Sequence, residues 1–88
     1  MKDDAVKHVN TQTYDRIREY LANSQFAYTD DIDKLCEDTI AVCNALIDDI
    51  TKYQTKHMTS PLRRARRGTK IIRDLGKIFR RVSVDISK

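Results

Sequence analysis

The apolar side chains between residues 32 and 53 recur every three or four residues, and this spacing limits the fold more than any other feature of the sequence. At about 100° per residue, such a spacing places them along one side of an α-helix. The stripe is about 160° wide, so the helix contacts two neighbours rather than one. We therefore expect a central helix over residues 30–57. The residues of the stripe are Ile32, Leu35, Cys36, Ile40, Val42, Cys43, Leu46, Ile47, Ile50 and Tyr53.

A second apolar stripe, between Ile71 and Ile86, lies on the side of a helix opposite to a stripe of basic residues. Ser60 can cap such a helix and Pro61 suits its first position, so we expect the helix to cover residues 61–84. The apolar residues are Ile71, Ile72, Leu75, Ile78, Phe79, Val82 and Ile86.

Two glycines leave two interpretations of this segment open. Each glycine costs about 1 kcal/mol relative to Ala inside a helix. In one interpretation the helix is continuous or slightly kinked, and Gly68, Ile72 and Gly76 share a side where another backbone can come close. In the other, a short helix ends at Gly68 and a new one begins near Thr69. We favour the continuous helix.

The sequence before residue 25 has a weaker helical pattern. Thr13 can cap a helix over residues 13–24, and residues 1–12 either extend its apolar face or form a loose N-terminal arm. One Pro and two Gly among 88 residues are too few for a turn-rich β fold. We therefore expect a single all-α domain over residues 1–88, a small three-helix bundle with a long antiparallel helical hairpin. The width of the central stripe favours a homodimer.

Charge is divided unevenly between the two parts of the chain. Residues 1–51 carry five basic and eleven acidic side chains, a net of −6, and residues 52–88 carry twelve basic and two acidic ones, a net of +10. Such an asymmetry indicates an anionic partner for the basic part: nucleic acid, an acidic protein or an acidic lipid surface. Attraction between acidic and basic helices of one bundle is the alternative explanation.

Nine basic residues of the last predicted helix form the candidate binding site. Arginine donates two parallel hydrogen bonds to phosphate oxygens, which lysine does less well. Along one helical face such side chains match the phosphate backbone of DNA or RNA, so we expect a small nucleic-acid-binding or regulatory protein. The alternative is an interaction or assembly module that docks on an acidic protein surface, and binding to a membrane surface is the third candidate. The nine residues are Arg63, Arg64, Arg66, Arg67, Lys70, Arg73, Lys77, Arg80 and Arg81.

Cysteine, histidine and aspartate residues give little support to catalysis or metal binding. Cys36 and Cys43 lie about 10 Å apart along the axis of one helix, too far for a disulfide. Neither their spacing nor the wide separation of His8 and His57 matches a structural zinc site. The aspartates are interpreted as caps and surface charges. We therefore expect a non-enzymatic protein without metal or cofactor, and its reduced thiols favour an intracellular, reducing compartment such as the cytoplasm or nucleus.

Overall fold

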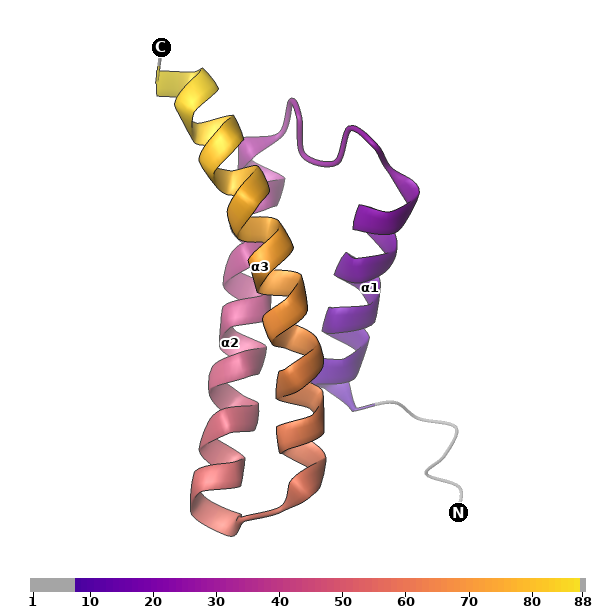
Figure 1. Ribbon diagram of the computed structural model, residues 1–88, viewed down its shortest axis with the longest axis vertical. Coiled ribbons are helices and arrows are strands. Elements are labelled where there is room, and N and C mark those ends of the chain that lie inside the picture. The colour runs from indigo at the N-terminus through magenta and orange to yellow at the C-terminus, as the bar shows by residue number, and fades with distance from the viewer. Residues whose placement is uncertain (1–7, 88) are drawn as a thin grey trace.

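The computed structural model describes residues 8–87, and within them the chain forms three helices and no strand (Figure 1). Helix α1 spans Val9–Asn23, α2 spans Ile32–Lys56 and α3 spans Thr59–Ser87. The predicted all-α class with three helices is therefore confirmed for these residues. In the described part of the chain, no helix combines the length and apolar character that crossing a membrane requires.

Helix α1 begins at Val9, earlier than the predicted start at residue 13. Thr13 is not its cap, because its hydroxyl donates to the carbonyl of Val9, and Nδ1 of His8 instead accepts from the N–H of Asn10. The first turn is stabilised by a distant part of the sequence, since the side-chain amide of Asn10 donates to two aspartates of α2. Residues 1–7 of the predicted N-terminal arm lie outside the described residues.

Helices α2 and α3 lie side by side and run in opposite directions (Figure 1). Only His57 and Met58 separate them. His57 adopts the left-handed conformation, with φ at 55°, and its N–H donates to the carbonyl of Tyr53 at 2.8 Å, which ends α2. Helix α3 begins at Thr59, slightly before Pro61, and this position suits proline because the first turn needs no amide hydrogen there.

The two glycines of α3 lie in different surroundings within one continuous helix, as favoured from the sequence. A β carbon on Gly68 would lie 2.7 Å from Cε1 of Tyr14 and 2.8 Å from Cδ2 of Leu46, so the three helices meet at this position. A β carbon on Gly76 would meet nothing within 4 Å. The close approach at Gly68 makes room for the buried ring of Tyr14. The other buried residues of the core cluster are Ile17, Ala27, Tyr28, Leu35, Val42, Ala45, Ile71, Leu75 and Val82.

Candidate anion-binding groove

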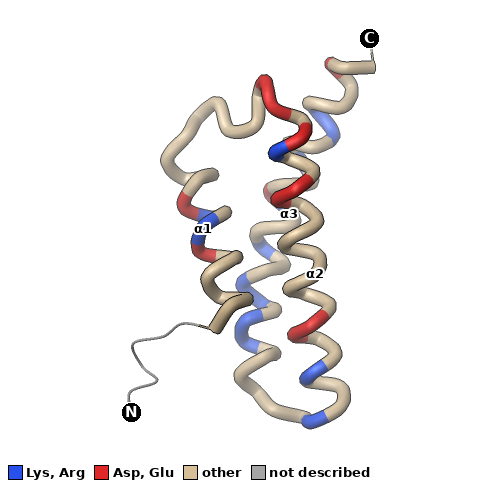
Figure 2. Tube along the Cα trace, turned by 180° about the vertical axis from the view of Figure 1, so that it is seen from behind, with Lys and Arg blue, Asp and Glu red and all other residues tan. Residues whose placement is uncertain are grey.

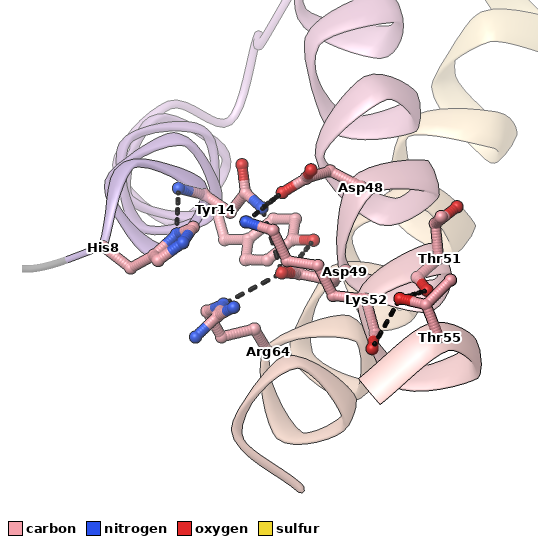
Figure 3. Close-up of polar contacts among 9 residues, drawn as sticks. His8, Tyr14, Asp48, Asp49, Thr51, Lys52, Thr55 and Arg64 are labelled. Atoms are coloured by element: carbon pink, nitrogen blue, oxygen red, sulfur yellow. Dashed lines mark hydrogen bonds and ion pairs between the residues drawn. The ribbon is translucent and has the colours of Figure 1, made fainter. Parts of the chain in front are cut away.

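Asp49 of α2 is fully buried and joins the three helices (Figure 3). Its Oδ1 accepts a hydrogen bond from Nε of Arg64 on α3 at 2.9 Å and another from the amide of Asn10 on α1 at 3.0 Å. Its Oδ2 accepts from the hydroxyl of Tyr14 on α1 at 2.9 Å. The carboxylate is thus satisfied by donors from two other helices, and one donor supplies the compensating positive charge. We call these four residues the Asp49 cluster.

A second buried carboxylate, Asp38 of α2, has a similar environment. Its Oδ2 accepts from the hydroxyl of Tyr28 at 2.6 Å, and its Oδ1 accepts from a guanidinium nitrogen of Arg16 on α1 at 3.3 Å. Nζ of Lys34 lies 3.5 Å from Oδ2. Tyr28 belongs to the connection between α1 and α2 and has a φ of 64°. Asp38 therefore fixes both α1 and this connection to α2.

The two buried tyrosines are held in their neutral form. Burial raises the pKa of Tyr14 and of Tyr28 well above the usual value of about 10. The buried aspartate that accepts from each hydroxyl raises the pKa further, because a nearby carboxylate opposes a phenolate. Asp48 lies at the surface beside this region, and hydrogen bonds from Lys52 and Asn10 lower the pKa of its carboxyl.

The interpretation of the aspartates as caps and surface charges is wrong for Asp38 and Asp49. The sequence does contain a signal, because these two residues continue the three- and four-residue spacing of Leu35, Val42 and Ala45. An aspartate at such a position needs donors from other helices. Those donors lie far away in the sequence, 35 residues in the case of Tyr14, so no local pattern points to them.

Arg64 differs from the other residues of the predicted binding site. Its side chain is 17% exposed, and its Nε lies 2.9 Å from Oδ1 of Asp49. Moving this guanidinium to an external ligand would leave a buried carboxylate without its counter-charge, which is strongly unfavourable. Arg64 therefore holds the helices together and is a poor candidate for ligand binding.

The remaining eight predicted residues are exposed on α3. Figure 2 shows basic positions along α3, whereas acidic positions gather at the beginning of α2 and in the connection before it. Arg67 lies 3.3 Å from Asp15 of α1, and Arg73 lies 3.5 Å from Asp74. The eight residues are Arg63, Arg66, Arg67, Lys70, Arg73, Lys77, Arg80 and Arg81.

Five of these eight residues line a groove of about 550 Å³ between α1 and α3, which we call the basic groove. Helix α1 contributes a sixth basic side chain, Arg18, and the acidic member of the lining is Asp74. Leu21 and Ala22 of α1 and Ile71 of α3 form its apolar part. The basic lining consists of Arg18, Arg63, Arg66, Arg67, Lys70 and Arg73.

Arg18 is absent from the site predicted from the sequence. It belongs to the acidic part of the chain and joins the arginines of α3 only because α1 packs against that helix. The groove leaves out Lys77, Arg80 and Arg81, which continue the basic surface toward the C-terminal end of α3. The structure thus divides the predicted site into three parts: the half-buried Arg64, which bonds to Asp49, the basic residues that line the groove, and an exposed extension.

Within residues 8–87, no group of three or more His, Cys, Asp or Glu side chains is arranged to hold a metal ion. Cys36 and Cys43 are unbridged and half-buried on α2. The chain matches no family model, no curated protein and no solved structure.

Proposed function

We propose that this protein is a non-enzymatic nucleic-acid-binding or regulatory protein that uses the basic groove and the basic surface of α3 beyond it. The observation that carries this proposal is the convergence of Arg18 of α1 with five basic residues of α3 on one groove. Guanidinium groups donate paired hydrogen bonds to phosphate oxygens. Neutralising phosphates also releases their counterions, which favours binding at low salt.

The fixed position of α1 supports the proposal that the groove binds an anionic ligand. Six like charges in one groove repel one another. Asp15, which lies 3.6 Å from Arg18 and 3.3 Å from Arg67, and Asp74 beside Arg73 compensate only part of that charge. Helix α1 is held in place by the Asp49 cluster and by the contact of Arg67 with Asp15, so Arg18 stays on its side of the groove. A polyanion would relieve the repulsion at several points at once.

The groove chemistry also indicates which part of a nucleic acid is contacted. None of the described residues that line the groove is aromatic, so stacking on unpaired bases has no platform there. Phosphate contacts position a protein on nucleic acid without reading its sequence. We therefore expect affinity that depends little on base sequence.

Charge-reversal variants test whether the groove contributes more to nucleic-acid binding than the rest of the basic surface of α3. The double variant Arg63→Glu with Arg66→Glu removes two cations of the groove, and Arg80→Glu with Arg81→Glu makes the same charge change on the same helix outside it. We expect the groove variant to weaken binding to labelled DNA and RNA duplexes about 100-fold and the control about tenfold, because the groove concentrates the phosphate contacts. Fluorescence anisotropy at low salt measures the affinities, and circular dichroism verifies that both variants keep their helicity. Equal losses would remove the groove from the proposal, and no binding of either nucleic acid by the wild-type protein would overturn it.

A second candidate function is docking on an acidic protein surface, which the apolar part of the groove favours. An amphipathic helix with acidic residues would place its apolar side on Leu21 and Ile71 and its carboxylates on the surrounding arginines. Titration with polyglutamate in parallel separates the candidates, because binding of polyglutamate without DNA or RNA supports the protein surface. Flotation with anionic liposomes tests the membrane candidate, for which Phe79→Asp should abolish binding.

We also propose that the working unit is a homodimer. The apolar stripe of α2 is wider than α1 and α3 together can cover, so Ile40, Ile47 and Ile50 stay exposed. Clustered exposed apolar side chains on a small protein favour association with another surface.

A further inference from the structure

Helix α2 exposes a strip of apolar and small residues on the flank that does not contact α1. Its members are alternately four and three residues apart, the spacing of seam residues in helical bundles. Ile40 and Ile47 are 59% and 63% exposed. Asp38 and Asp49, which bond to α1, lie on the opposite flank of α2. The α2 strip consists of Cys36, Ile40, Cys43, Ile47 and Ile50.

Helix α3 has a matching strip, which consists of Thr69, Ile72, Gly76 and Phe79 at intervals of three and four residues. A β carbon on Gly76 would meet nothing within 4 Å, and Phe79 is 37% exposed, so this flank of α3 is also uncovered. Arg67, which bonds to α1, lies on the opposite flank. Since α1 packs on one side of the α2–α3 pair, the α2 strip and the α3 strip both face the other side.

The two strips are complementary in size at each level of the helix pair. Leu46 stands level with Gly68, as their contact shows, and α2 and α3 run in opposite directions. Counted along the two helices from this pair, four pairs of strip residues lie within two residues of the same level, which is about 3 Å of helical rise. The pairs are Cys36 with Phe79, Ile40 with Gly76, Cys43 with Ile72 and Ile47 with Thr69. A small residue stands level with a large one in every pair.

We infer that a second copy of this chain covers both strips, related to the first by a two-fold axis parallel to α2 and α3. In this arrangement the α2 strip of each copy packs on the α3 strip of the other. Ile40 then fills the open space beside Gly76 of the second copy, and Phe79 packs over Cys36 of the second copy. In such a two-fold interface each copy contributes the same surface, as in other symmetric dimers. The core of the dimer then consists of four helices, α2 and α3 of each copy.

Charge and area both favour a second copy as the occupant. Glu37 is exposed next to the α2 strip, and Arg80 is exposed next to the α3 strip within one helical turn of the same level. The two-fold axis brings each Glu37 close to Arg80 of the second copy. A helix of 25 residues is about 37 Å long, and two helices side by side are about 20 Å wide, so the whole face measures about 750 Å². The strips occupy somewhat more than half of it, since residues 36–50 span about 21 Å, and polar residues surround them. A standard stable interface takes about 800 Å² from each partner.

This inference rests on the proposed homodimer but not on nucleic-acid binding, because the basic groove lies on the flank of α3 that contacts α1. The first test of the inference is to measure the molecular mass in solution of the wild-type protein and of two variants. Sedimentation equilibrium over a range of concentrations gives this mass. Ile40→Asp places a charge in the middle of the α2 strip, whereas Phe26→Asp makes the same kind of change at a side chain that is 68% exposed outside it. We expect dimers of the wild type and of Phe26→Asp, and monomers of Ile40→Asp with unchanged helicity.

Gly76→Ala tests the size complementarity. In an isolated copy the added methyl group meets nothing, so the variant folds. In the proposed dimer the same space receives Ile40 of the second copy, and we expect the dissociation constant of the dimer to rise about tenfold.

Two results contradict the inference in different ways. A wild-type protein that is monomeric at every concentration refutes both the dimer and the homodimer proposed above. A dimer whose dissociation constant is unchanged in Ile40→Asp and Gly76→Ala refutes only this interface, because the second copy then sits elsewhere. Neither result affects the test of the basic groove, which uses separate variants.

Discussion

At the scale of single residues, the structure depends most on the two buried aspartates. An ionised carboxylate in a protein core costs several kcal/mol unless donors surround it, and Asp49 has such donors from α1 and α3. Their bonds have defined directions, so they fix the position of α1 along the other two helices. The sequence identifies the nine basic residues but not this role of Arg64, because its partner is a carboxylate that looks like one of many surface charges.

The Asp49 cluster gives a direct prediction for stability. Asp49→Ala removes the shared acceptor of Tyr14, Asn10 and Arg64 and leaves the guanidinium without its counter-charge. We expect the free energy of unfolding to fall by about 3–5 kcal/mol. Urea unfolding followed by circular dichroism measures this change. Asp48→Ala, at the exposed neighbouring position, is the control and should cost far less, and equal losses would show that Asp49 has no special role.

The buried tyrosines predict a loss of stability in alkaline solution. Because the pKa of Tyr14 and of Tyr28 is raised above its unfolded value of about 10, folding favours their neutral form. Their contribution to stability is complete below pH 10 and is lost as the pH rises above that value. We expect the double variant Tyr14→Phe with Tyr28→Phe to be less stable at neutral pH but to lose less stability between pH 9 and pH 11, as measured by urea unfolding. A wild-type protein and a variant with parallel pH curves would contradict this explanation.

At the scale of the helices, long periodic patterns predict the structure well and interactions between distant residues do not. The apolar spacing gives α2 and α3, and the basic stripe of α3 is exposed as expected, apart from Arg64. The start of α1 is missed because Asn10 is held by aspartates that follow it by 38 and 39 residues. The sequence does not predict the groove either, because Arg18 joins the basic residues of α3 only through the packing of α1 on α3.

The two glycines of α3 provide a test of helix packing. Gly68→Ala brings a methyl group within 3 Å of Tyr14 and Leu46, and we expect a loss of about 1–3 kcal/mol in the free energy of unfolding. Gly76→Ala adds a methyl group in open space and should raise that free energy by up to about 1 kcal/mol, because alanine favours the helix. Both changes are best measured in the Ile40→Asp background, which removes the second copy. If both variants raised, or both lowered, the free energy of unfolding, the result would contradict the difference in packing around Gly68 and Gly76.

At the scale of the whole molecule, the three helices separate structural charges from exposed ones. The acidic side chains of α2 that lie in the core bind α1 and α3, whereas five of the eight exposed basic side chains of α3 line the groove. This separation explains how a chain with a net charge of +4 presents a much stronger local positive charge on one side. An anionic polymer is the ligand that we propose for such a surface.

The salt dependence of binding tests this account most directly. The affinity of the wild-type protein for DNA and RNA duplexes is measured by fluorescence anisotropy over a series of salt concentrations, with polyglutamate as the comparison. If the basic groove neutralises about five phosphates, the logarithm of the association constant falls linearly with the logarithm of the salt concentration, with a slope of about −4 to −5 for DNA. No detectable binding of DNA or RNA at low salt, or an affinity for them that salt does not change, would contradict it.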